Sequence, residues 1–145
     1  MELNKISKKI EELIIENNNI DGFYGDGESI VDIPEIPIKH RFADQLYIRQ
    51  MTMKKDQVVI GAIHNHLHVW FLLKGRVLIN NNGKKIEHVA PCYTVSEPGS
   101  KRLIYAIEDS IFVNVHKNPT NTEDIEELER QIVSTSEEEY NKKNK

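Results

Sequence analysis

Short apolar runs alternate with polar residues and turns through the middle of the chain, a pattern typical of β-strands. Pro98-Gly99 is one such turn, and Asn81-Asn82-Gly83 predicts a hairpin, because Asn-Gly tolerates the positive φ that such turns need. About eight to ten short strands between turns are expected of a sandwich or barrel. We expect strands over residues 46–53, 58–64, 68–73, 76–80, 84–89, 93–96, 102–106 and 111–116, the last two pairing with each other.

The two ends of the chain carry a helical pattern instead. Residues 3–16 place apolar side chains at helical spacing, with lysines and glutamates on the other face, and predict an amphipathic helix. The glycine-rich segment 21–27 is interpreted as a surface loop, with a lid over a pocket as the alternative. Residues 123–133 repeat the helical spacing, and Thr120 with Glu123 matches a capping box at their start.

This pattern predicts an N-terminal amphipathic helix over 1–20, a β-barrel over 21–117, and a C-terminal helix with a charged tail over 118–145. The tail is expected to fray, because it is strongly charged. A chain of 145 residues is long enough to bury one substantial core, so we expect all three parts to form one domain.

Composition narrows the class of protein. A hydrophobic fraction of 39% with 29% charged residues is typical of soluble globular proteins. The net charge of -4, without a dense basic patch, disfavours nucleic-acid binding. The single cysteine, Cys92, excludes an internal disulfide and fits a reducing compartment. No apolar run approaches a membrane span and the charged N-terminus is unlike a signal peptide, so we predict a cytoplasmic protein that does not bind membranes.

Three of the six histidines fall within five residues, at His64, His66 and His68, beside an apolar run. Side chains alternate faces along a strand, so these three would share one face if the strand ran unbroken. Three imidazoles on the inner wall of a barrel could hold one divalent ion, such as Fe, Mn, Ni or Zn, and leave positions open for a substrate. The alternative is that these histidines only form hydrogen bonds within a polar barrel mouth.

Residues 40–116 resemble the cupins, which are small double-stranded β-helix (jelly-roll) barrels. Gly75 fits the glycine that closes the first cupin motif, and His68 stands seven residues before it, where the family usually has glutamate. His64 and His66 supply the HxH of that motif, but one residue, instead of three or four, separates them from His68. In the second motif, Pro98-Gly99 is followed by Arg102, where the family usually has histidine.

The resemblance implies an all-β cupin barrel with a helix added at each end, and a fourth metal ligand that is missing or supplied from elsewhere. More narrowly, residues 42–129 resemble small cupin-like proteins of tailed phages and prophages, through FADQLYIRQM, LLKG, APCYTVSEPGSKRLIYA and VHKNPTNTEDIEELE. For a phage protein, the cytoplasm is that of the host. The resemblance implies little about activity, because fold alone does not give function.

Other residues on the predicted strands are candidates for ligand binding. Arg102 and Arg49 would hold an anionic ligand if they point inward, and Tyr93 could reach the same pocket. For Tyr93, a core tyrosine with a satisfied hydroxyl is the simpler interpretation. Any of three further histidines could complete a metal shell, although a structural or surface role is simpler for each alone: His40, His88 and His116.

Three hypotheses follow. The first is a metal-dependent cupin that acts on a small molecule, with a dioxygenase or isomerase as the kind of reaction found in the wider family. The second is non-catalytic capture of a small anionic ligand, such as a nucleotide signal or a sugar phosphate. The third is a structural or assembly role, in which the apolar faces of the two terminal helices bind partners, including a second copy in a homodimer. The sequence leaves open whether the protein is an enzyme.

Overall fold

A computed structural model describes residues 36–81, 84–134 and 137–144. The predicted helix over 3–16, the glycine-rich segment 21–27 and the Asn82-Gly83 tip of the predicted hairpin lie outside the described residues. Within the described ranges, the chain forms eleven strands and two helices, in agreement with the predicted predominance of β-structure. No helix in these ranges is long and apolar enough to cross a membrane.

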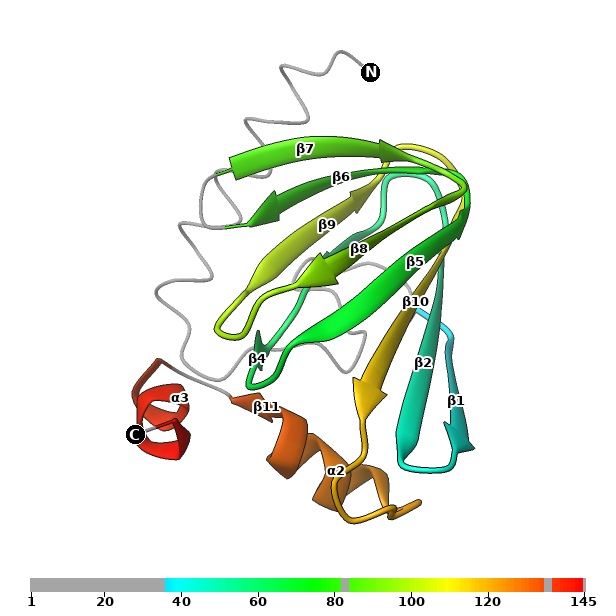
Figure 1. Cartoon of the computed structure of the whole chain (residues 1–145). Helices are drawn as coiled ribbons and strands as arrows, with labels where there is room; N and C mark the ends of the chain where they lie inside the picture. Colours follow the sequence, from blue (N-terminus) through cyan, green and yellow to red (C-terminus); the bar gives the residue numbers. More distant parts are fainter. Residues whose placement is uncertain (1–35, 82–83, 135–136, 145) are drawn as a thin grey trace.

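Nine strands form two antiparallel sheets that face each other across the core (Figure 1). The five-stranded sheet runs in the order β1 (Ile38–Ala43), β2 (Leu46–Met53), β10 (Ser110–Lys117), β5 (His68–Lys74) and β8 (Cys92–Ser96). The four-stranded sheet runs in the order β3 (Val58–Ile60), β9 (Arg102–Ala106), β6 (Arg76–Asn81) and β7 (Lys84–Val89).

Alternate residues of both sheets point into a shared apolar core. Met51, Trp70 and Phe112 come from the five-stranded sheet, and Val77 and Ile104 come from the four-stranded sheet. Each is less than one-tenth exposed, and burying a side chain of this size stabilises the fold by about 1.5–3 kcal/mol. The period of two in the sequence therefore reports the inward face of each strand.

The predicted pairing of the last two strands is wrong. β9 pairs with β3 and β6, whereas β10 pairs with β2 and β5, so the connection between β9 and β10 crosses from one sheet to the other. This connection is held against the corner between β5 and β6, because the backbone N–H groups of Ile107 and Glu108 both donate to the carbonyl oxygen of Arg76. A short link between strands did not make them neighbours.

The predicted strand over 58–64 is divided in two. β3 ends at Ile60, and β4 (Ile63–His64) leaves the four-stranded sheet to pair with β11 (Val133–Ser134) near the end of the chain. Between them, the N–H of Gly61 donates to the carbonyl oxygen of Arg102 over 2.8 Å. This break changes the direction of the chain immediately before the histidines.

The C-terminal helix α2 (Ile125–Ile132) confirms the amphipathic pattern predicted there. The capping box of Thr120 and Glu123 is wrong, because the side chain of Asp124 caps the helix by accepting from the N–H of Glu127. Asp124 starts the helix later than the box would, and its carboxylate meets the positive end of the helix dipole. The buried residues of α2, Leu128 and Ile132, pack against Tyr47 of β2.

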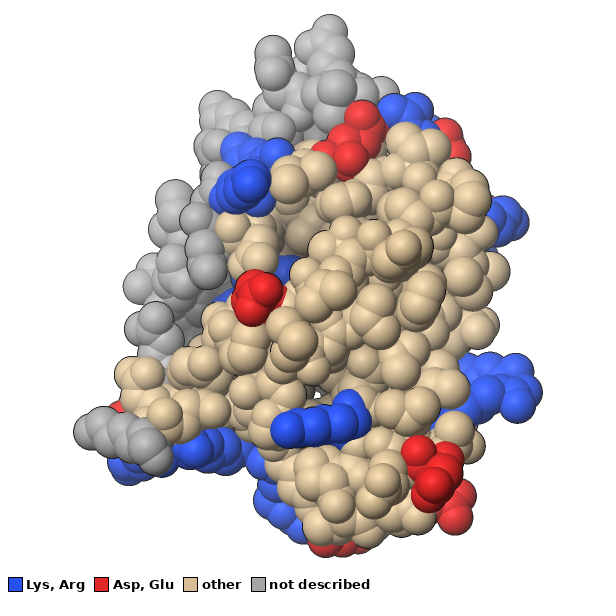
Figure 2. Space-filling view, in the orientation of Figure 1, with Lys and Arg blue, Asp and Glu red and all other residues tan. Residues whose placement is uncertain are grey.

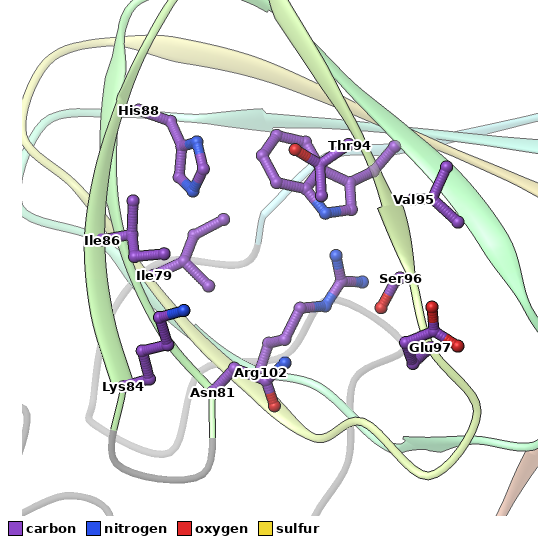
Figure 3. A pocket seen from close by; sticks show the side chains of 11 residues that line it. Ile79, Asn81, Lys84, Ile86, His88, Thr94, Val95, Ser96, Glu97 and Arg102 are labelled. Carbon is purple, nitrogen blue, oxygen red and sulfur yellow. The ribbon is translucent and has the colours of Figure 1, made fainter.

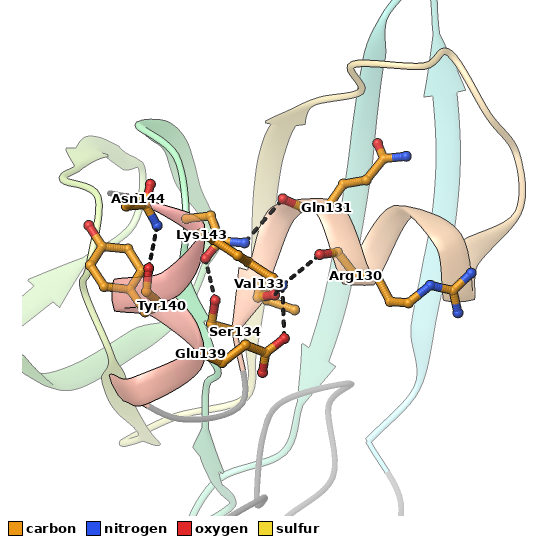
Figure 4. Close-up of polar contacts among 9 residues, drawn as sticks. Arg130, Gln131, Val133, Ser134, Glu139, Tyr140, Lys143 and Asn144 are labelled. Atoms are coloured by element: carbon orange, nitrogen blue, oxygen red, sulfur yellow. Dashed lines mark hydrogen bonds and ion pairs between the residues drawn. The ribbon is translucent and has the colours of Figure 1, made fainter.

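A second short helix, α3 (Glu137–Lys143), forms in the tail that was predicted to fray. Nζ of Lys143 donates to the carbonyl oxygens of Arg130 and Val133, over 2.7 and 3.0 Å, so α3 is fastened to the end of α2 and to β11 (Figure 4). Lys143 also forms an ion pair with Glu139 at 2.9 Å. These contacts give the charged tail partners that its sequence alone does not reveal.

Candidate functional site

Three buried histidines meet inside the barrel: His64 on β4, His68 on β5 and His116 on β10. One ring nitrogen of each lies within 4.8 Å of the others. The ring centroids of His64 and His68 are 4.3 Å apart, and that of His116 lies 5.3 and 4.5 Å from them. Because β10 pairs with β5 through Val115 and Val69, His116 comes opposite His68. We call this group the histidine cluster.

The backbone holds His64 at this position from two sides. Its N–H donates to the carbonyl oxygen of Ser100 over 3.1 Å, and its own carbonyl oxygen accepts from the N–H of Gly99 over 2.7 Å. On the other side, β4 pairs with Val133 and Ser134 of β11. The turn before β9 and the end of the chain therefore fix the first histidine together.

Arg102 reaches the histidine cluster from the facing sheet. Its Nη2 lies 3.4 Å from Nε2 of His64 and 3.3 Å from Nε2 of His68, and it donates to Oδ1 of Asn114 over 3.0 Å. The side chain is only 4% exposed, and its guanidinium carbon lies 5.6 Å from the centre of the Phe112 ring. A permanent positive charge is thus buried beside imidazole nitrogens.

The contacts of His68 Nε2 depend on where its proton lies. This nitrogen is also 3.2 Å from Oδ1 of Asn114, to which it can only donate. It cannot donate to Asn114 and accept from Arg102 at once, so the two tautomers give different networks. Nδ1 of His68, like Nδ1 of His64, is buried without a hydrogen-bond partner in the described part of the chain.

Burial and the neighbouring positive charges keep the imidazoles neutral. Burial, followed by the charge of Arg102, lowers the pKa of His64 well below its usual value and that of His68 to about 4. Burial, followed by the charges of His68 and Arg102, likewise lowers the pKa of His116 well below its usual value. Burial, with the charge of Arg49, also lowers the pKa of Arg102 to about 9, so the guanidinium stays protonated at neutral pH. Neutral imidazole is the form that binds metal ions.

Tyr47 connects this site to the outer layer of the protein. Its ring lies against that of His116, with centroids 6.0 Å apart, and its hydroxyl is 2.6 Å from Nδ1 of His40. Burial raises the pKa of Tyr47 to about 12, so its hydroxyl keeps its proton. Because Leu128 of α2 packs on the same ring, the C-terminal helix supports the histidine cluster through Tyr47.

The residues predicted from sequence fall into two groups. The structure brings His64, His68 and Arg102 together, and Arg49 points inward from β2 on the same face as Tyr47 and close enough to act on the pKa of Arg102. Two of the predicted residues lie elsewhere: His66 and Tyr93.

His66 sits in the bend between β4 and β5, half-buried and outside the histidine cluster. The unbroken strand that would have aligned it with His64 does not exist. Tyr93 is 71% exposed on the outer face of β8, because the alternation along that strand turns Thr94 inward instead. His116, which the sequence offers as one of three histidines that could complete a metal shell but for which a structural or surface role is simpler, joins the cluster. Asn114 is not predicted from the sequence, although both residues share the inward parity of Phe112 on β10.

A cavity of 280 Å³ adjoins Arg102 (Figure 3), and none of the three histidines of the cluster is among the residues that line it. It lies between β7 and β8, which are edge strands of the two sheets. Trp70, Ile79 and Ile86 give it apolar walls, and Arg102 is its buried cation. Arg102 therefore stands between the histidine cluster and the cavity, in contact with both.

No protein-family model matches the chain, and no curated protein is similar to it in sequence at a significant level. Solved structures do match. A protein with a double-stranded β-helix domain from Klebsiella pneumoniae is 17% identical with a TM-score of 0.54, over 69% of this chain and 91% of that chain. A cupin superfamily protein from Desulfitobacterium hafniense is 11% identical with a TM-score of 0.52, over 60% and 81%.

A predicted oxalate decarboxylase from Thermotoga maritima is 17% identical with a TM-score of 0.50, over 56% of this chain and 78% of that chain. At this level of identity the likeness shows the fold alone. It confirms the predicted double-stranded β-helix for the β-rich part of the chain.

Proposed function

Because the chain has the double-stranded β-helix fold of cupin barrels, we propose that it is a small-molecule-binding protein that holds one divalent transition-metal ion on His64, His68 and His116. The observation that carries this proposal is the meeting of three buried, neutral imidazoles, from three strands, with ligand atoms within 4.8 Å of one another. His66, which we first expected to be a ligand, is replaced in this set by His116.

The chemistry of these residues fits a metal ion. Two buried ring nitrogens, Nδ1 of His64 and Nδ1 of His68, have no hydrogen-bond partner among the described residues, and buried polar atoms without partners are costly. A metal ion bonded to these Nδ1 atoms would give them a partner, whereas an ion bonded to Nε2 would fix Nδ1 as an N–H donor. Nη2 of Arg102 occupies the space beside both Nε2 atoms, so the guanidinium must move away when an ion binds there.

The donor set narrows the choice of metal. Imidazole suits Zn, Fe and Ni, whereas Mn favours carboxylate and water ligands. No carboxylate belongs to the histidine cluster within the described ranges. Of the four ions expected from the sequence, we therefore propose Zn, Fe or Ni before Mn. When bound, the ion supplies Lewis-acid chemistry at its open positions.

Elemental analysis of untagged protein, purified and also reconstituted with each metal, tests this proposal. A polyhistidine tag is omitted because it binds metal itself. We expect near-stoichiometric metal that is lost when His64→Ala and His68→Ala are combined. Metal content that is unchanged in this double variant, or no metal in either protein after reconstitution, would refute the metal proposal.

The predicted homodimer also has a candidate surface. The outer side chains of β5 and β8 include Leu73, Tyr93 and Val95, which are 55%, 71% and 55% exposed. Figure 2 shows that Lys, Arg, Asp and Glu lie around this surface and hardly over it. Exposed apolar patches of this kind mark interaction sites, so we propose that a second copy packs here. Sedimentation of Tyr93→Glu beside the unaltered chain tests this, and an unaltered chain that is monomeric would exclude the dimer.

The phage origin, the host cytoplasm and the reaction class stay predictions. One structural neighbour is a predicted oxalate decarboxylase, which makes small carboxylic acids reasonable candidate substrates. A panel of small carboxylic acids, incubated with the reconstituted protein and followed by mass spectrometry, tests for turnover.

A further inference from the structure

The cavity beside Arg102 has a distinct chemical character. Its apolar walls come from Trp70, Ile79 and Ile86, and Arg102 lines it as well. The guanidinium of Arg102 lies beside Ser96 in this cavity (Figure 3). The ring of His88 meets the indole of Trp70 edge-on, with centroids 4.9 Å apart. A flat apolar group would therefore find a flat aromatic wall and a cation at the same end.

The charge of Arg102 is not compensated by the protein. No carboxylate in the described part of the chain forms an ion pair with it. Nη2 contacts His64, His68 and Asn114, but Nε and Nη1 are buried without any hydrogen-bond partner among the described residues. Burying an unpaired charge is expensive, and leaving its donors unsatisfied adds to the cost. An anion that reached these donors would remove both penalties.

The charged residues around the cavity indicate how many negative charges its ligand carries. Arg102 and Lys84 oppose a single acid, Glu97, so one positive charge is unbalanced. A monoanion matches this balance, whereas a phosphate, which carries between one and two negative charges at neutral pH, exceeds it. The planar guanidinium is suited to a carboxylate, and the volume of 280 Å³ fits a small molecule.

From these observations, we propose that the cavity binds a small monocarboxylate with a flat apolar body. The carboxylate accepts hydrogen bonds from the Nη1 and Nε groups of Arg102, and the apolar body lies between Trp70 and Ile79. The proposal rests on the proposed function only in that the barrel is a small-molecule site, and it names the class of ligand. It does not require the metal ion, because the histidine cluster does not line the cavity.

Benzoate is a suitable probe for the complete chain, and benzamide is its uncharged counterpart of similar shape. Trp70 is the only tryptophan in the sequence and lines the cavity, so its fluorescence reports directly on binding. We expect saturable binding of benzoate to chelator-treated and to metal-reconstituted protein. Benzamide should bind at least about tenfold more weakly, because it cannot form charge-assisted hydrogen bonds with Arg102.

The matched variants are Arg102→Gln and Arg76→Gln. Arg76 pairs with Glu87 on the surface and does not line the cavity. Arg102→Gln should weaken benzoate binding at least about tenfold, whereas Arg76→Gln should leave it unchanged. Circular dichroism shows whether each variant folds. If Arg102→Gln does not fold, the comparison of benzoate with benzamide on the unaltered chain still tests whether the cavity selects a carboxylate.

Three results would overturn the proposal: no benzoate binding in either state of the protein, equal binding of benzoate and benzamide, or benzoate binding that survives in folded Arg102→Gln. Binding of inorganic phosphate in place of benzoate would overturn the assigned ligand class. Metal content measured on the same samples keeps the two proposals apart. Benzoate binding to protein that never takes up metal refutes the metal site alone, and metal uptake without benzoate binding refutes the carboxylate site alone.

Discussion

Nη2 of Arg102 donates to Oδ1 of Asn114 over 3.0 Å, and this hydrogen bond joins the two sheets across the interior of the barrel. Arg102 belongs to β9 of the four-stranded sheet, and Asn114 belongs to β10 of the five-stranded sheet. The same two side chains both contact Nε2 of His68. The polar link between the sheets and the candidate metal site therefore form one hydrogen-bond network. A substitution in one of them alters the contacts of the other.

His116 and His66 should differ in their effect on metal content. We expect His116→Ala to reduce bound metal by at least about tenfold under matched conditions, because one of three ligands is lost. His66→Ala, the control, should retain metal, because His66 lies in the bend outside the histidine cluster. Elemental analysis of both variants checks this. Loss of metal in His66→Ala and not in His116→Ala would restore the ligand set first expected from the sequence.

Removal of the positive charge of Arg102 should increase metal affinity. Its Nη2 lies 3.4 and 3.3 Å from Nε2 of His64 and of His68, so its positive charge repels a divalent ion held by these rings. Arg102→Leu should therefore bind Zn²⁺ at least about tenfold more tightly, in competition with a chelator. Arg76→Leu removes the same charge from the surface and should change little. Weaker binding in Arg102→Leu would mean that the arginine supports the histidines instead of opposing the ion.

Chelator-treated protein should lose stability in mild acid. A histidine in the unfolded chain has a pKa of about 6.5, whereas that of His68 is lowered to about 4 and those of His64 and His116 lie well below the usual value. Between these values the unfolded chain binds more protons, so the free energy of unfolding falls as the pH drops from 6.5 towards 4. His68 alone would contribute a loss of roughly 3 kcal/mol by pH 4.

Urea unfolding at pH 7 and at pH 4.5 measures this loss. Carboxylates also take up protons in this range, so His68→Gln serves as the control for the histidine contribution. Its midpoint should shift less between the two pH values than that of the unaltered chain. Equal shifts in both proteins would show that His68 is not held neutral by the fold.

Gly75→Ala should destabilise the protein more than Gly99→Ala. Both glycines have positive φ, at 90° and 82°, which alanine adopts at a cost. A Cβ at Gly75 would also collide with Oγ of Ser110 and the backbone oxygen of Asp109, whereas at Gly99 it would meet the movable Tyr140 hydroxyl at 3.1 Å. We expect a loss of more than about 2 kcal/mol for Gly75→Ala, from chemical unfolding. Equal losses of stability in the two variants would mean that the positive φ, and not the collision of the Cβ, determines the cost of each substitution.

The strand positions could be predicted from the sequence, but their partners could not. β2, β7 and β9 begin and end where alternation and turn residues place them. Alternation reports which face of a strand is buried, and it carries no information on which strand lies beside it. The two sheets exchange strands along the chain, so β9 and β10 are close in sequence and belong to different sheets.

The candidate site was predictable only in part for a related reason. His64 and His68 came from local spacing, and the resemblance pointed to Arg102. The parity of Phe112 on β10 could have added His116, because residues 112, 114 and 116 face inward together. Nothing local shows that His66 falls in a bend, since that bend depends on β4 pairing with β11, far along the chain.

The pairing of β4 with β11 also bears on the order in which the protein is made. Oγ of Ser134 donates to Oδ1 of Asn65 over 2.6 Å, although the two residues are 69 positions apart. A nascent chain emerges from the ribosome N-terminal end first, and each part folds as its partners become available. His64 and His68 therefore leave the ribosome well before β11, the strand that fixes His64, has been synthesised.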